Sequence, residues 1–336
     1  MPSELRVDKV SSTTSPYDPV FSTTGGALSH RNMIINGAMQ VAQRSTSSTG
    51  LGGSNGYFTC DRWRHVFNTS GRLTSSQDSD APNGFGNSLK FACTTADTSI
   101  ASNEYFIIQQ KIEGQNLQSF AKGTSDAKAF MVSFYVKGNA SATYVCELYD
   151  SDNDRLISKT FNVTTSWSRV ELSFPADTTG AFDDDNNTSL NIQIWPHAGS
   201  DFTSGTINSS AWASVTNANR GGSGTTSFFD STARTFYITG VQLELGTVAT
   251  PFEHRSHADE LARCQRYFYK CTRTGYAFGR GNGTANLADV GLPVAVPMRD
   301  TDNLTFDGTG NWYAIDDNSY VNGTNAGFTP ITGVEH

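Results

Sequence analysis

Apolar and polar residues alternate with a period of two over residues 130–137, and this pattern constrains the fold more than any other. Every second residue from Phe130 to Val136 is apolar, so these side chains share one face of a predicted strand. A glycine and an asparagine end that strand, and residues 143–149 provide an antiparallel partner. The pattern therefore predicts a sheet with one face against a core.

Further strand-like segments follow at short intervals. They are residues 155–163, 167–174, 190–195 and 236–245. In the third of these, Leu190, Ile192 and Ile194 lie on one face. Short strands separated by polar turns are typical of a β-sandwich. Residues 197–233 interrupt the series, and we interpret them as a long loop-like insertion, a type of segment that often carries function.

The composition fits an all-β chain and excludes some functions. Hydrophobic residues make up 37% and charged residues 17% of the 336 residues, and the formal net charge is −8. A general nucleic-acid binder needs a basic stripe, so we expect no nucleic-acid partner. No apolar run reaches the roughly 18 residues of a membrane span, so we expect no membrane insertion. The five cysteines form no CxxC pair, and we predict buried free thiols.

The sequence divides into four predicted parts. Residues 1–30 are either a floppy terminus or an extended arm that attaches to a partner, and 31–254 form the sandwich. Residues 255–270 are a linking helix, with apolar residues at helical spacing, and 271–336 form a small C-terminal β domain. Within the sandwich, residues 31–41 are predicted to form a strand or bent strand pair around Asn36-Gly37, and another strand re-enters the core at Asp61–Trp63.

Several blocks are similar to the jelly-roll carbohydrate-binding modules found beside glycosidases. These are Asn36-Gly37, Phe134-Tyr135-Val136-Lys137, Trp167 and Gly240-Val241-Gln242-Leu243-Glu244. The resemblance implies a jelly-roll β-sandwich. Many such modules hold a structural Ca²⁺ with one carboxylate near the first strand and one on the last. Here Met39-Gln40 replaces the first carboxylate and Glu244 alone remains, so we predict no metal site and no cofactor.

A second resemblance is closer and covers residues 31–270. The chain resembles a family of tailed-phage tail-fibre or virion appendage proteins of the marine phage type in the blocks RNMIINGAMQVAQR, GYFTCDRWR, QQKIEGQNLQ, SFYVKGNAS, FDDDN, FYITGVQLELGTVATPFEHR and LARCQRYFYK. The resemblance implies a virion protein, assembled in the host cytoplasm as a homotrimer. It also implies that residues 1–30 attach to other phage tail or capsid proteins.

No catalytic pattern is present in the sequence. There is no GxSxG elbow, no phosphate-binding loop and no HExxH, so we predict that the chain is not an enzyme. Aromatic residues beside polar ones remain as candidates, because sugars stack on flat rings. The predicted ligand-binding residues are Trp212, Trp312, Tyr313, Asp316 and Asp317. The alternative is that these aromatic rings fill core or subunit contacts.

Three functions follow from this reasoning. The first is a tail fibre or fibre tip that recognises a host-surface glycan during adsorption. The second is a capsid head fibre or decoration protein. The third is a tailspike-like hydrolase, which would need two carboxylates about 5–9 Å apart in a cleft.

Overall fold

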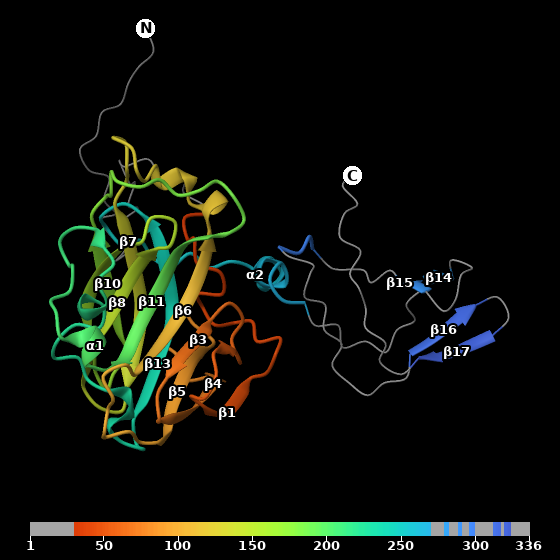
Figure 1. Ribbon diagram of the computed structural model, residues 1–336, viewed down its shortest axis with the longest axis horizontal. Helices are drawn as coiled ribbons and strands as arrows, with labels where there is room; N and C mark the ends of the chain where they lie inside the picture. Colours follow the sequence, from red (N-terminus) through yellow and green to blue (C-terminus); the bar gives the residue numbers. More distant parts are fainter. Residues whose placement is uncertain are drawn as a thin grey trace, which may run out of the picture. The chain divides into compact units, whose positions relative to one another are not determined.

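Two antiparallel β-sheets face each other across a hydrophobic core (Figure 1). The computed structural model describes residues 30–269, 279–281, 288–290, 296–299, 312–316 and 319–323. The chain divides into two compact units, residues 1–256 and 257–336. Within the described residues, no helix has the length and apolarity needed to cross a lipid bilayer. The predicted attachment arm lies outside the described residues except for His30.

In both sheets of the first unit, many neighbouring strands are distant in sequence. The six-stranded sheet has the order β1 (Ser47–Leu51), β4 (Arg72–Asp78), β5 (Ser88–Thr95), β13 (Thr235–Leu245), β7 (Phe130–Gly138) and β10 (Ser168–Phe174). The seven-stranded sheet has the order β12 (Ala213–Ser214), β9 (Arg155–Val163), β8 (Ala142–Asp150), β11 (Thr188–Ala198), β6 (Tyr105–Glu113), β3 (Arg64–Asn68) and β2 (Gly56–Tyr57). This all-β, jelly-roll sandwich confirms the predicted fold class.

Short helices fill the connections between strands. They are η1 (Gly114–Asn116), η2 (Gln118–Phe120), α1 (Ser200–Thr203), η3 (Asn217–Asn219) and η4 (Phe228–Asp230). Most of residues 197–233 is loop, as predicted, although α1, β12, η3 and η4 lie within it.

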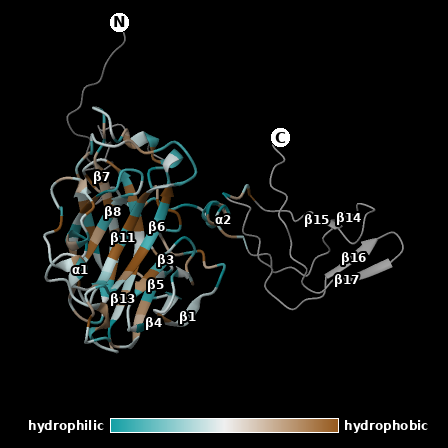
Figure 2. Ribbon diagram, in the orientation of Figure 1, coloured by the Kyte–Doolittle hydropathy of each residue, from teal (hydrophilic) through white to brown (hydrophobic). Residues whose placement is uncertain are grey.

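The core forms where the inward faces of the two sheets meet. Phe134 of β7 and Phe161 of β9 pack edge to face across it, with ring centroids 5.0 Å apart. The apolar residues predicted to share a face, such as Val132 and Ile192, are fully buried. Figure 2 shows apolar residues along the central strands of both sheets. Burial of this apolar area is the main stabilising contribution to such a sandwich.

Four cysteines confirm the prediction of buried free thiols. They are Cys60, Cys93, Cys146 and Cys264. The fifth, Cys271, lies outside the described residues.

The prediction of strands at residues 31–41 and 61–63 is wrong. Residues 31–41 contain turns and irregular backbone, and the strand that follows Trp63 begins only at Arg64. Asn36, Met39 and Arg62 have positive φ angles of 58°, 56° and 73°. This left-handed conformation is incompatible with a continuous strand.

Residues 32–37 instead form hydrogen bonds with β13, the last long strand of the sandwich. The Met33 amide donates to the Leu243 carbonyl at 2.9 Å, and the Val241 amide donates to the Gly37 carbonyl at 3.0 Å. The Asn32 side chain reaches the same strand, donating to the Val241 carbonyl at 3.1 Å and accepting from the Leu243 amide at 3.1 Å. We call these hydrogen bonds between residues 32–37 and β13 the clasp.

Asn36 organises the turn beside the clasp. Its side-chain amide donates to the Val41 and Asp61 carbonyls at 2.8 and 2.9 Å, and its oxygen accepts from the Val41 amide at 3.0 Å. The buried Trp63 indole donates to the Asn36 carbonyl at 3.1 Å. A side chain that satisfies three backbone groups at once explains why this segment folds without a strand ladder.

The second unit contains the predicted helix and two hairpins. Helix α2 (His257–Gln265) confirms the prediction but ends before Lys270. The hairpins pair β14 (Gly279–Gly281) with β15 (Ala288–Val290) and β16 (Trp312–Asp316) with β17 (Ser319–Gly323).

We predict that Gly37→Ala destabilises the protein by about 2–4 kcal/mol. An added Cβ would lie far inside van der Waals contact of the Val241 carbonyl oxygen, so the clasp must open. Overpacking costs about 1–3 kcal/mol and a lost buried hydrogen bond about 1 kcal/mol. Gly53→Ala is the matched control, because nothing lies within 4 Å of its added Cβ. Urea unfolding measures both variants, and equal midpoints would contradict the role of the clasp.

A buried histidine makes stability depend on pH. His65 of β3 is fully buried, both ring nitrogens lack a hydrogen-bond partner, and its centroid is 5.1 Å from that of Phe91. Burial lowers the pKa of His65 to about 3. Between pH 6.5 and 3 the unfolded chain therefore binds a proton that the folded chain does not, and stability falls as the pH falls.

We predict that His65→Leu reduces the loss of stability between pH 7 and pH 5 by about 2 kcal/mol, the contribution of one proton over that interval. Urea unfolding of both proteins at the two pH values measures the difference. The same substitution at the exposed His254 should leave the wild-type pH dependence in place. An unchanged pH dependence in His65→Leu would rule out this histidine as its source.

Candidate functional site

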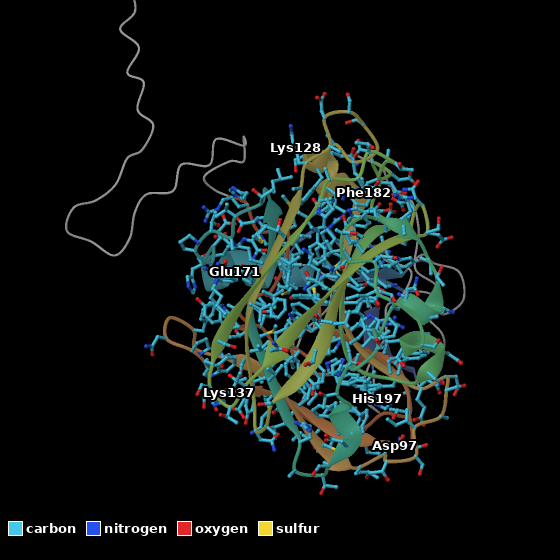
Figure 3. The ribbon with its side chains drawn as sticks, turned by 90° about the vertical axis from the view of Figure 1, so that its left-hand side faces the viewer. Asp97, Lys128, Lys137, Glu171, Phe182 and His197 are labelled. Carbon is cyan, nitrogen blue, oxygen red and sulfur yellow. The ribbon has the colours of Figure 1, made fainter. Side chains whose placement is uncertain are left out.

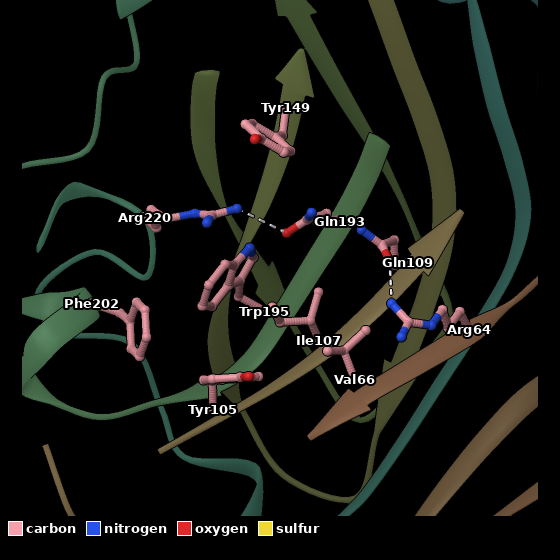
Figure 4. A pocket seen from close by; sticks show the side chains of 10 residues that line it. All are labelled: Arg64, Val66, Tyr105, Ile107, Gln109, Tyr149, Gln193, Trp195, Phe202 and Arg220. Carbon is pink, nitrogen blue, oxygen red and sulfur yellow. Dashed lines mark hydrogen bonds between the residues drawn. The ribbon is translucent and has the colours of Figure 1, made fainter. Parts of the chain in front are cut away.

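A groove with a volume of about 320 Å³ lies on the outer face of the seven-stranded sheet (Figure 4). The residues that line it come from four strands, α1 and the loop after η3. They are Arg64, Val66, Tyr105, Ile107, Gln109, Tyr149, Gln193, Trp195, Phe202 and Arg220. Small-molecule sites in proteins have volumes of roughly 300–1,000 Å³, so the groove is large enough for a small ligand.

Strand periodicity places these side chains on the outer face. On β11, Ile192 and Ile194 belong to the core between the sheets, so Gln193 and Trp195 project the opposite way. On β6, Ile108 points inward in the same way, and its neighbours Ile107 and Gln109 line the groove. The strands that bury the core therefore also build the groove.

One end of the groove is polar. The strand registers align Arg64, Gln109, Gln193 and Glu147 in a row across β3, β6, β11 and β8. Arg64 donates to the side-chain oxygen of Gln109 at 3.3 Å, and the Gln109 amide donates to Asn191 at 3.0 Å. This end presents guanidinium and amide groups, which can donate and accept several hydrogen bonds.

The other end of the groove is aromatic. The Trp195 ring forms its floor and is 2% exposed. Tyr105 and Phe202 flank it with ring centroids 6.3 and 5.6 Å away, and their own rings meet edge to face at 5.4 Å. Tyr105 and Phe202 are half-buried, so each presents part of a ring to solvent.

Arg220 connects the polar and aromatic ends. Its guanidinium donates to the fully buried Glu147 carboxylate at 2.6 Å and to the Gln193 side chain at 3.3 Å. It also lies over two rings, 5.0 Å from the Trp195 centroid and 5.2 Å from that of Tyr149. Burial raises the pKa of Glu147. Because Arg220 covers this carboxylate, Glu147 is engaged in an ion pair and does not line the groove.

Trp212 lies in the core and not at the surface. It is 7% exposed, its ring centroid is 5.4 Å from that of Phe130, and its indole donates to the Pro175 carbonyl at 2.9 Å. The buried Lys122 ammonium lies 5.4 Å from the ring centroid. This placement does not support the predicted contact between Trp212 and a ligand and matches the alternative, a ring that fills the core.

The other four predicted ligand residues belong to the second unit. Trp312, Tyr313 and Asp316 form part of β16, where the structure describes the backbone only, and Asp317 lies outside the described residues. Their proposed contact with a ligand stays a prediction.

Glu244, the carboxylate that remains from the calcium pattern, is held by protein donors. It accepts from the Thr250 amide at 2.8 Å, the Thr250 hydroxyl at 2.6 Å and the Gln242 amide at 2.9 Å. These donors stabilise a buried carboxylate without requiring a cation.

The sequence analysis missed the groove residues, although β11 carries a signal for them. Between the apolar residues of this strand stand Asn191, Gln193 and Trp195. Two amides and an indole on the outward face of a central strand indicate a polar and aromatic patch on the outer side of the sheet. Aromatic residues within strands usually belong to the core, so the sequence alone does not single out Trp195 as part of a site.

No known protein family and no curated protein matches this sequence. Among solved structures, the protein is similar to the enzymatically active domain of bacteriophage CBA120 tailspike protein 4. The two share 12% identity and a TM-score of 0.31, over 64% of this chain and 21% of the tailspike chain. It is also similar to a family 61 carbohydrate-binding module in complex with β-1,4-galactotriose, with 10% identity and a TM-score of 0.31, over 64% of this chain and 99% of the module.

A third similar structure is the family 11 carbohydrate-binding module from Clostridium thermocellum in complex with a β-1,3-1,4-mixed-linked tetrasaccharide. It shares 12% identity and a TM-score of 0.29, over 61% of this chain and 99% of the module. At these TM-scores the likenesses are loose, and they carry no conclusion about binding or catalysis.

Proposed function

We propose that the groove on the seven-stranded sheet binds a glycan. The observation that supports this most is the juxtaposition of half-buried aromatic rings with amide and guanidinium groups in one depression. A sugar has apolar C–H faces and polar hydroxyls, so it needs both kinds of contact. Tyr105, Tyr149 and Phe202 offer the rings, while the half-buried Arg64 and Arg220 offer N–H groups that pair with hydroxyls.

The lining of the groove favours binding over hydrolysis. No Asp or Glu is among the described residues that line it. Most glycoside hydrolases need two carboxylates that flank the scissile bond. We therefore propose a non-catalytic glycan-binding protein.

The charge at the polar end of the groove favours an acidic sugar. Arg64 forms no ion pair with any described residue, and its guanidinium points along the groove toward Gln109. Guanidinium groups recognise carboxylates with paired hydrogen bonds. A uronic or other carboxylated sugar would supply the missing partner.

We further propose that the protein is a virion appendage, a tail fibre or fibre tip that uses this groove during adsorption. The support is the resemblance of several sequence blocks within residues 31–270 to phage appendage proteins. In this proposal residues 1–30 attach the protein to other tail or capsid proteins, and it forms a homotrimer. Three copies per fibre would multiply a weak affinity per site. A capsid head fibre is the alternative, and residues Trp312, Tyr313, Asp316 and Asp317 remain candidates for a second contact.

For the glycan proposal, we predict that Tyr105→Ala lowers the affinity for an acidic bacterial surface polysaccharide by roughly tenfold, since an interface aromatic contributes about 1–2 kcal/mol. A glycan array would identify the ligand and calorimetry would measure the affinity. Tyr237→Ala, a half-buried tyrosine on β13 of the other sheet, is the control and should bind like wild type. An equal loss of affinity in both variants, or no binding to any glycan, would contradict the proposal.

For the virion proposal, we predict that the full chain is a trimer at micromolar concentration and is present in purified particles. Analytical ultracentrifugation gives the oligomeric state. Mass spectrometry of dissected particles assigns the protein to tails or heads. A stable monomer that is absent from particles would contradict this role, whatever the glycan assay shows.

A further inference from the structure

Three residues with metal-ligating side chains meet at one end of the sandwich, outside the groove. Asp97 follows β5, Glu104 precedes β6, and His197 lies near the end of β11. One carboxylate oxygen of each acid and one ring nitrogen of the histidine lie within 4.8 Å of one another. Figure 3 shows Asp97 and His197 together at the lower end of the molecule.

The cluster is buried, and two of its ligand atoms have no hydrogen-bond partner. Asp97 is 7%, Glu104 6% and His197 2% exposed. Asp97 Oδ2 and His197 Nε2 have no hydrogen-bond partner, and Nε2 lies 3.8 Å from Glu104 Oε2, too far for a hydrogen bond. Buried polar atoms without partners are rare and costly, and an ion is one of the standard explanations.

Surrounding groups hold the Glu104 and His197 side chains in place. Glu104 accepts backbone hydrogen bonds from Ser70 and Ala101, each at 3.2 Å, on its two oxygens. The other ring nitrogen of His197, Nδ1, lies 2.8 Å from the Ser227 hydroxyl. Such a partner orients a ligating imidazole and leaves Nε2 facing the carboxylates.

The donor set indicates the kind of ion. Two buried carboxylates repel each other unless a proton or a cation lies between them. Ca²⁺ and Mg²⁺ prefer oxygen ligands alone, whereas imidazole suits transition metals such as Zn²⁺. Ligand atoms around tetrahedral Zn²⁺, with bonds of about 2.0–2.2 Å, lie roughly 3.4 Å apart, and the 3.8 Å separation of Nε2 and Oε2 is close to this.

We propose that Asp97, Glu104 and His197 bind a divalent transition metal ion, for which Zn²⁺ is the probe. The site joins the loop between β5 and β6 to the end of β11. We infer a structural role, because the ligands are buried and no groove residue belongs to the site; a water molecule would complete the four ligands of Zn²⁺.

The test uses the full chain after treatment with a chelator. We expect one equivalent of Zn²⁺ to bind and to raise the Tm by roughly 5–10 °C at a hundredfold excess over Kd. Ca²⁺ should have a much smaller effect. Asp97→Asn should lower the Zn²⁺ affinity at least roughly tenfold. Without metal, the Tm of this variant should equal or exceed that of wild type, because one of two repelling charges is gone.

Asp126→Asn, a substitution of an exposed aspartate, is the matched control and should retain the full Zn²⁺ response. X-ray absorption at the zinc edge gives a readout that does not depend on variant folding, and it should show imidazole and oxygen donors without sulfur. No bound zinc, zinc retained equally by Asp97→Asn, a sulfur ligand, or an equal response to Ca²⁺ would each overturn the proposal.

Discussion

The sandwich depends on hydrogen bonds between the first described residues and the last long strand. The clasp fastens residues 32–37 to β13, and β13 lies between β5 and β7 in the middle of its sheet. Arg255 extends the same connection by donating to the Ile34 carbonyl at 2.9 Å. These bonds join segments more than 200 residues apart, so they close a loop that contains nearly the whole first unit.

The groove and the buried cluster share strands of the seven-stranded sheet. Glu104 immediately precedes Tyr105 of the groove, and His197 follows Trp195 by two residues on β11. The Gly199 amide donates to the Glu104 carbonyl at 2.7 Å, which ties the start of α1, and with it Phe202, to the same point. The buried cluster and the aromatic end of the groove are therefore connected through covalent neighbours and one hydrogen bond.

Local periodicity predicted a large part of this fold. The strands from residue 130 to 245 and the helix at residue 257 appear where alternation and helical spacing placed them. The segment around Asn36 does not form the predicted strand. Its conformation depends on side-chain hydrogen bonds to Asp61 and Val41, which no repeat pattern encodes. β6 was also missed, since Gln109 and Gln110 interrupt its apolar run.

Local periodicity could not predict the groove or the buried cluster. Both depend on β11 lying beside β6, which brings Gln193 opposite Gln109 and His197 opposite Phe106. Single-sequence patterns indicate which face a residue occupies, but not which strands are neighbours. Trp212 shows a related difficulty, because a long loop around an aromatic residue resembles a binding loop even when the ring is buried in the core.

The alternation along β11 has a consequence for how such a protein diverges. Ile192 and Ile194 maintain the fold, while Gln193 and Trp195, one position away, face outward. Substitutions at the outward positions change the groove lining and the small cluster in which Trp195 packs on Ile107 and Val145, and they do not enter the core between the sheets. During evolution, the outward residues of this strand can therefore change when the partner changes, while selection preserves the inward residues.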